Sequence, residues 1–204
     1  MNVRQKQREH TCEMILNGAE ETFLKQGYSG ASMKHIAKAS GVTQSLIHHY
    51  YNNKAGLWSA VRKRCFQKIF ESLRPGLSAA ARGNEFLNEF THNYYQYLRD
   101  APEFMQLLAW IIAEKGTPPE ESAGKSEQIM QIIEREQKNG NIRDDIPAEI
   151  ILSLVWSLVE GWHMGRQQYA HRLGKDLNNK NWDNLYLDGL KKILVSSFKK
   201  VINE

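Results

Sequence analysis

The apolar positions of this 204-residue chain recur at intervals of three and four residues, and the alternation that marks a strand is nearly absent. Such spacing puts apolar side chains on one face of a helix. The first stripe runs from Cys12 to Phe23. Gly27 is expected to end that helix, because glycine adopts a left-handed C-terminal turn without steric cost. The pattern predicts an all-α protein.

Residues 32–51 predict two short helices joined by a tight turn. Ser32 and Thr43 stand where N-cap hydroxyls belong, one before each helix. Gly41 lies between the helices, and its small size is expected to let them cross closely. The second helix is expected to dock on the first through Val42, Ile47 and Tyr51. This pattern is typical of a helix-turn-helix.

The remainder of the chain also has helical spacing. A helix is expected from about Lys54 to Leu73, where Pro75 and Gly76 interrupt the pattern. We expect an N-terminal three-helix domain of residues 1–56 and a larger helical domain of residues 57–204. Within the larger domain the expected helices are 84–99, 103–115, 124–139, 147–171 and 183–202, with a loop at 116–123.

Charge is unevenly distributed along the chain, although the formal net charge is only +4. The segment from Gly27 to Phe70 contains no aspartate or glutamate. Its basic residues are Lys34, Lys38, Lys54, Arg62, Lys63, Arg64 and Lys68. A block of like charge creates a positive local field, which suggests an anionic partner such as nucleic acid or a membrane surface.

Several features suggest a cytoplasmic protein. Cys12 and Cys65 are far apart and outside any C-x-x-C pair, which suits a reducing compartment. The polar N-terminus lacks the apolar core of a signal peptide. Its basic residues Arg4, Lys6 and Arg8 form a short arm that could enter a minor groove, but we expect them in a disordered, solvated tail. The longest apolar run, 150–159, is too short to span a bilayer, so we expect no membrane partner.

The run 47-IHHYY-51 raises three interpretations: a metal site, an acid–base site, or a surface that meets an anion. His48 and His49 point about 100° apart on a helix, so they cannot chelate one ion together. No acidic residue lies within twenty positions of either histidine, which weakens catalysis without excluding it. We expect no metal and no cofactor.

The outward face of the same helix carries short or flat hydrogen-bonding groups. The second helix of a helix-turn-helix lies in the major groove and reads base edges with such groups. Gln44 can form two hydrogen bonds to adenine, and Leu46 can meet a thymine methyl group. Other groups are placed to bond phosphates. We predict a DNA interface made by Ser32, Thr43, Gln44, Ser45, Leu46, His48, His49, Tyr50 and Lys54.

Residues 11–58 resemble the DNA-binding domain of the TetR (tetracycline repressor) family, chiefly in 23-FLKQGYSGASMKHIAKASGVTQSLIHHYYNNKAGLW-58. In that family the aromatic residue matching Tyr51 is core, and the positions matching Tyr50 and Lys54 hold the DNA backbone. The segment 140-GNIRDDIPAEIILSLVWSLVEGW-162 resembles, more weakly, the family's turn into its first dimerisation helix. The resemblance implies a homodimeric repressor that binds a palindromic double-stranded operator and is released by a small effector.

Aromatic side chains are frequent in the C-terminal helices, alongside a few polar groups. Apolar pockets have this composition, although aromatic residues at helical spacing are more often core. Val155 and Leu194 are expected at the dimer interface if they face the partner. Candidate effector contacts are Tyr94, Trp110, Glu114, Trp162 and His163. The alternative function is an all-helical enzyme or ligand-binding protein that uses this pocket, yet the sequence offers no clear cluster of titratable residues.

Overall fold

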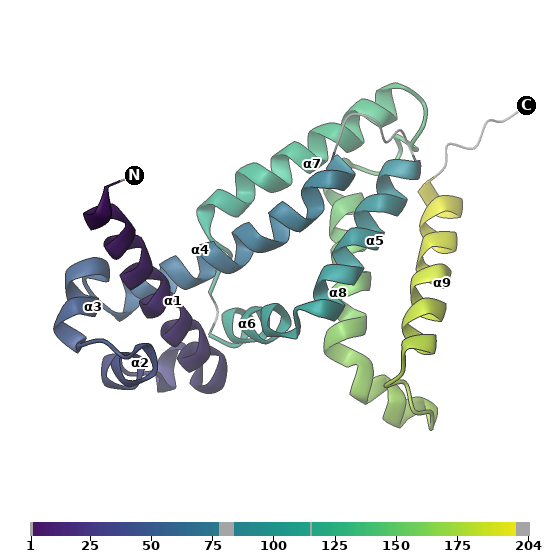
Figure 1. Ribbon diagram of the computed structural model, residues 1–204. Helices are drawn as coiled ribbons and strands as arrows, with labels where there is room; N and C mark the ends of the chain where they lie inside the picture. Colours follow the sequence, from purple (N-terminus) through teal and green to yellow (C-terminus); the bar gives the residue numbers. More distant parts are fainter. Residues whose placement is uncertain (1, 78–83, 115, 199–204) are drawn as a thin grey trace, which may run out of the picture. The chain divides into compact units, whose positions relative to one another are not determined.

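The computed structural model describes residues 2–77, 84–114 and 116–198, and within these ranges the chain is all-α, as predicted (Figure 1). Two compact units are formed. The N-terminal unit contains residues Met1–Gln67 and Gln106–Glu120, and the C-terminal unit contains Lys68–Met105 and Glu121–Glu204. The elements are α1 (Val3–Gly30), α2 (Met33–Ser40), α3 (Gln44–Tyr51), α4 (Lys54–Leu73), η1 (Arg74–Leu77), α5 (Asn84–Asp100), α6 (Pro102–Ala113), α7 (Glu120–Lys138), α8 (Ala148–Leu173) and α9 (Lys180–Phe198).

These bounds lie within a few residues of the predicted helices. The last predicted helix extended to residue 202, and residues 199–202 lie outside the described part of the chain. The compact units do not divide at the boundary expected between residues 56 and 57. Instead, α4 continues across that position, and residues 106–120 belong to the N-terminal unit.

A close crossing of α1 and α2 organises the N-terminal unit. The buried residues Ile15, Phe23, Ile36 and Ile47 fill its core. A Cβ on Gly18 would lie 2.5 Å from the Ser40 nitrogen, so the two backbones meet at this glycine. Between α2 and α3, where we expected a close crossing at Gly41, a Cβ on that glycine would meet only Met14, at 3.9 Å. Gly41 is instead required by its left-handed conformation, with φ 67°.

Helix α1 is interrupted at Gly27, whose φ of 67° and ψ of 178° are not helical. The prediction that the helix ends here is therefore incomplete, because helical structure resumes and continues to Gly30. Residues 106–120 supply partners at the interruption. The Trp110 indole Nε1 donates to the Leu24 carbonyl at 3.0 Å, and the Glu114 Oε1 accepts from the Ser29 amide at 3.0 Å.

A second attachment joins the same segment to α4 and α4 to α1. Arg62 donates to the Thr117 carbonyl at 2.6 Å and lies over the Trp58 ring. Trp58 packs edge-on against Phe23, with ring centroids 4.8 Å apart. Segment 106–120 is therefore part of the structure that supports α1 and α4 within the N-terminal unit.

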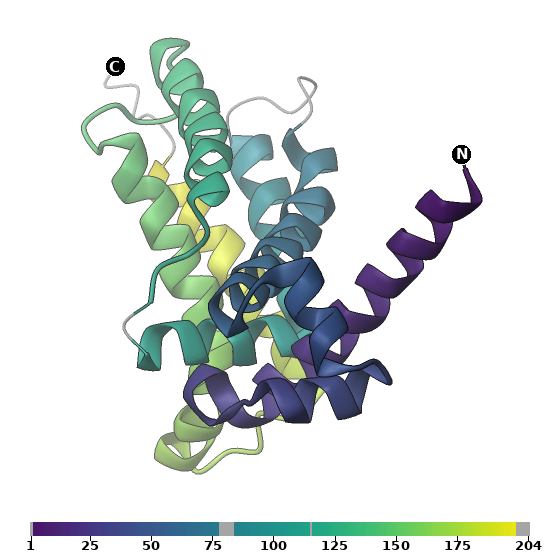
Figure 2. The same ribbon diagram turned by 90° about the vertical axis from the view of Figure 1, so that its left-hand side faces the viewer.

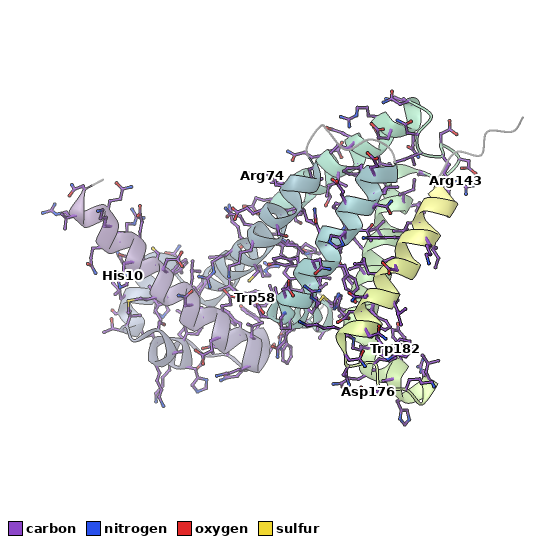
Figure 3. All side chains as sticks on the ribbon, turned by 45° about the vertical axis from the view of Figure 1, so that its right-hand side comes forward. His10, Trp58, Arg74, Arg143, Asp176 and Trp182 are labelled. Atoms are coloured by element: carbon purple, nitrogen blue, oxygen red, sulfur yellow. The ribbon has the colours of Figure 1, made fainter. Side chains whose placement is uncertain are left out.

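In the C-terminal unit, α5 packs against both α8 and α9 (Figure 1). A buried carboxylate, Asp183 on α9, joins the three helices. It accepts from the Tyr95 hydroxyl at 2.7 Å and from the Trp162 indole at 3.3 Å, and it pairs with Arg166. The Trp162 ring stacks on Tyr186 with centroids 4.2 Å apart. Figure 3 labels Asp176 in the α8–α9 connection, Trp182 in the first turn of α9 and Arg143 in the α7–α8 connection.

Helices α8 and α9 each expose large apolar side chains. Leu154 is 40% and Leu158 is 36% exposed, and Ile193 on α9 is 58% exposed. Val155 and Leu194 were expected at the dimer interface if they face the partner. That condition is not met, because these side chains are 0% and 1% exposed and belong to the core of the unit. Because residues 150–159 are apolar on most sides of the helix, the sequence did not indicate which side faces the core.

The first turns of α1 extend away from α2 (Figure 2). Helix α1 begins at Val3, and the Asn2 side chain accepts from the Arg4 amide. Arg4, Lys6 and Arg8 therefore lie on exposed helix and not on the unstructured tail that we expected. Within the described ranges, none of the helices has the length and apolarity that crossing a bilayer requires.

Candidate nucleic-acid interface

Helices α2 and α3 are each started by a hydroxyl and separated by a left-handed glycine. The Ser32 Oγ accepts from the His35 amide, and the Thr43 Oγ1 accepts from the Leu46 amide, both at 3.2 Å. Gly41 ends α2, and its amide donates to the Ala37 carbonyl. The predicted N-cap geometry of Ser32 and Thr43 is thus present. Their contacts to phosphate remain predictions.

The orientation of α3 is fixed by Ile47, which is fully buried. The other side of this eight-residue helix is in solvent. Leu46 and Tyr50 are half-buried along its edges. The exposed residues of α3 are Gln44, Ser45, His48 and His49, four of the nine residues predicted to contact DNA. The structure therefore brings these four side chains to one outward surface of α3.

The C-terminal end of α3 is closed by a reciprocal pair of bonds. The Asn52 amide donates to the His48 carbonyl at 2.9 Å, and the His48 Nδ1 lies 2.7 Å from the Asn52 carbonyl oxygen. Asn52 has φ 61° and ψ −56°, the geometry of the central residue of a γ-turn, which the Asn53 amide closes by donating to the Tyr51 carbonyl at 2.7 Å. His49 differs, because its ring meets Tyr50 edge-on, with centroids 5.4 Å apart.

Lys54 points into the N-terminal unit. Its Nζ donates to the carbonyls of Tyr28 and Ala31 at 2.9 and 3.0 Å and lies 4.4 Å from the centre of the Tyr28 ring. A cation that bonds the last carbonyls of a helix stabilises that helix end. Lys54 thus holds α4 against the end of α1. Its predicted phosphate contact stays a prediction, with this internal role beside it.

Tyr51, which the family resemblance implies to be core, is at the margin of the core. It is half-buried, and burial, then the neighbouring Cys12, raises the pKa of its hydroxyl. Helix α4, which follows Tyr51, is capped at its first turn. The Asn53 side-chain oxygen accepts a hydrogen bond from the Gly56 amide at 2.9 Å.

The positive charge of the acid-free segment is partly neutralised from α1. Arg64 pairs with Glu20 and Glu13 and donates to Asn17 at 2.9 Å. Lys34 and Lys38, in contrast, are exposed on α2. They were not among the predicted contacts, although their place in the acid-free run could have indicated them. The fold thus keeps exposed positive charge on α2, next to α3.

The candidate effector residues fall in different units. Trp110 and Glu114 belong to the N-terminal unit, where they bond α1 as described. Tyr94, Trp162 and His163 belong to the C-terminal unit. Trp162 already has partners in Asp183 and Tyr186. The five residues therefore do not gather within one unit, and effector contact by any of them stays a prediction.

Two titratable groups in the C-terminal unit, Tyr94 and His163, have strongly shifted pKa values. Burial, followed by the nearby Glu160 carboxylate, raises the pKa of the Tyr94 hydroxyl, which donates to Glu160. Burial, followed by the charge of Arg166, lowers the pKa of His163 to about 4. The His163 ring is therefore neutral at pH 7, and its buried Nε2 has no hydrogen-bond partner among the described residues. Those residues also contain no group of three histidine, cysteine or acidic side chains able to hold a metal ion.

Family models match both parts of the chain. The model described as "Bacterial regulatory proteins, tetR family" matches residues 15–61, and "Tetracyclin repressor-like, C-terminal domain" matches residues 87–182. Among curated proteins, the HTH-type transcriptional repressor NicS of Pseudomonas putida is 24% identical over 185 residues, which cover 87% of each chain. The HTH-type transcriptional regulator UidR of Escherichia coli is 24% identical over 168 residues, covering 79% of this chain and 84% of that protein.

Solved structures show the same fold. A TetR family transcription regulator from Marinobacter aquaeolei aligns with a TM-score of 0.76 at 14% identity, over 97% of this chain and 100% of that one. AibR in complex with isovaleryl coenzyme A and operator DNA aligns with a TM-score of 0.69 at 17% identity, over 91% and 98% of the two chains. At these identities the likeness concerns the fold alone.

Proposed function

This chain belongs to the TetR family of bacterial regulatory proteins, and from that premise we propose that it is a homodimeric repressor of a palindromic operator, released by a small effector. Family membership makes it a DNA-binding transcriptional regulator. The proposal that this protein reads an operator sequence is carried by one observation, the outward surface of α3. Its four exposed hydrogen-bonding side chains are presented by a helix whose rotation Ile47 fixes.

Contact between α3 and base edges predicts that the protein binds a defined operator sequence. Selection of bound sequences from a random DNA pool should yield two inverted half-sites whose centres are about 34–36 Å apart, one helical turn of DNA. Gln44→Ala should relax the preference at one position in each half-site by roughly 1–3 kcal/mol and leave the other positions unchanged. A consensus that survives Gln44→Ala intact would show that Gln44 is not a reading residue.

A homodimer is supported by the apolar face of α8 and α9. Ile150, Leu154 and Leu158 follow one another at four-residue intervals and are 36–49% exposed. Leu185 and Ile193 add further exposed apolar area on α9. Side chains four residues apart adjoin on a helix, so the three α8 residues form an apolar stripe, and an exposed apolar patch on a folded protein is typical of an interface. A second copy that offers the same face would form a two-fold symmetric contact.

Leu158→Glu is expected to yield folded monomers that no longer bind the operator. A charge at an exposed position costs the monomer little, whereas burial of that charge in an apolar interface is unfavourable. Gln167→Glu, at another exposed position of α8, is the matched control and should remain dimeric. Sedimentation at micromolar concentration measures the outcome. A wild type that sediments as a monomer, or a Leu158→Glu protein that stays dimeric, would contradict this interface.

For the effector we propose a site in the C-terminal unit that includes Tyr94 and His163. The unpartnered Nε2 of a neutral His163 supports a ligand that forms a hydrogen bond with it, and Tyr94 supplies aromatic surface. Such a ligand lowers operator affinity only by its difference in affinity for the free and DNA-bound protein. Operator binding titrated with candidate ligands tests this, with tryptophan fluorescence reporting occupancy. A ligand that saturates the protein without weakening operator binding would refute the coupling.

A further inference from the structure

The His48 ring has one nitrogen committed by the fold. Its Nδ1 lies 2.7 Å from the carbonyl oxygen of Asn52, and that oxygen can only accept a hydrogen bond. The Nδ1 must therefore carry the proton. The reverse bond from the Asn52 amide to the His48 carbonyl, at 2.9 Å, makes the arrangement reciprocal. The conformation of Asn52, with φ 61°, belongs to this arrangement at the end of α3.

A neutral imidazole carries one N–H and one bare nitrogen, and the bond made by one ring nitrogen decides the state of the other. With the proton on Nδ1, the Nε2 of His48 is a hydrogen-bond acceptor. Gln44 and Ser45 do not have this restriction, because an amide or a hydroxyl can donate as well as accept. Among the exposed side chains of α3, His48 thus has a fixed hydrogen-bonding polarity.

The position of His48 puts that acceptor on the predicted reading surface. His48 lies one turn after Gln44, so the two side chains share a face of α3. Buried Ile47 keeps that face outward, and the His48 side chain is exposed. His49 provides a contrast on the same helix. Its ring meets Tyr50 edge-on, and among the described residues no hydrogen bond fixes which of its nitrogens is protonated.

We propose that His48 selects an amino base, adenine or cytosine, over a keto base, guanine or thymine, at one position of each half-site. This inference rests on the proposed operator binding. In the major groove, adenine and cytosine present amino donors, N6 and N4, whereas guanine and thymine present the acceptors O6 and O4. An unprotonated Nε2 accepts a hydrogen bond from the amino group. It cannot bond a keto oxygen, because both atoms are acceptors and neither supplies a proton.

The test compares wild type, His48→Ala and His49→Ala, each as the full chain, in DNA selection at pH 8. Wild type and His49→Ala should select adenine or cytosine at the position in question, and His48→Ala should accept all four bases there. In the selected operator, purine then replaces adenine, or pyrimidin-2-one replaces cytosine. Either analogue removes only the amino group, so wild-type affinity should fall about fivefold to tenfold and His48→Ala affinity should stay constant.

Nitrogen-15 NMR of the wild type provides a readout that does not depend on any variant, and it should find the proton of the His48 ring on Nδ1 in the free and DNA-bound protein. A keto base at the His48-dependent position, an unchanged affinity for the amino-free operator, or a bare Nδ1 would overturn the inference. A selection that gives a consensus unaffected by His48→Ala also overturns it, while the proposed function stands. A wild type that selects no sequence at all overturns the proposed function and this inference together.

Discussion

Gly27→Ala is expected to destabilise the N-terminal unit by roughly 2–6 kcal/mol. The combination of φ 67° and ψ 178° lies in a region that is essentially restricted to glycine, and forcing another residue into it costs about 1–3 kcal/mol. In addition, the new Cβ would lie 2.7 Å from the Trp110 ring. A displaced indole could no longer donate to the Leu24 carbonyl, and overpacking of this kind costs about 1–3 kcal/mol more.

Gly30→Ala is the matched control for this experiment. It lies three residues away on the same helix, and its new Cβ would meet only the Gln26 Cβ at 3.5 Å. We expect a change in unfolding free energy of less than about 1 kcal/mol there. Urea unfolding of the full chain measures both variants. Equal midpoints for Gly27→Ala and wild type would show that the interruption of α1 does not depend on glycine.

Asp183→Ala is expected to destabilise the C-terminal unit by about 3–5 kcal/mol, the usual cost of removing one member of a buried ion pair. The change leaves Arg166, whose side chain is only 21% exposed, without its carboxylate. It also removes the acceptor of the Tyr95 hydroxyl and of the Trp162 indole. Because those donors come from α5 and α8, the contacts among three helices weaken together.

Two further variants separate charge from packing at this position. Asp183→Asn keeps an oxygen that accepts hydrogen bonds but loses the charge, so its destabilisation should be intermediate. Asp188→Ala removes an exposed carboxylate from the same helix and should change the unfolding free energy by less than about 0.5 kcal/mol. Circular dichroism during urea unfolding measures all three. An Asp183→Ala protein as stable as wild type would mean that the ion pair contributes nothing net.

The local structure of α2 and α3 could be predicted because its determinants are adjacent in sequence. Ser32 and Thr43 are hydroxyls directly before apolar-periodic segments, and Gly41 takes the left-handed turn between them. Burial of Ile47 then decides which side chains of α3 face outward. The helix caps, the turn and the rotation of α3 all depend on residues within one short segment. Apolar spacing and the conformational preferences of the turn residues were therefore sufficient to predict them.

Contacts between distant segments could not be predicted in the same way. Trp110 lies 86 residues from Leu24, and nothing in the spacing of α6 indicates that its C-terminal half bonds α1. An indole beside a carboxylate one turn away fits an effector pocket as well as a helix support. For Val155 and Leu154 the difficulty was geometric. A helix that is apolar on most sides has two candidate stripes, and only the positions of its neighbours decide which of them is core.

The membership of residues 106–120 in the N-terminal unit also bears on protein synthesis. The ribosome makes α1 to α4 first, but the Trp110 and Glu114 side chains that bond α1 follow much later. At about 5–20 residues per second, the roughly 50 residues from Gln67 to Glu120 take on the order of 3–10 s. For that interval the contacts of Trp110 and Glu114 with α1 are missing, so α3 belongs to an incomplete N-terminal unit. The DNA-binding unit therefore cannot mature as an independent product of early translation, and it is finished only after the first helices of the C-terminal unit have been made.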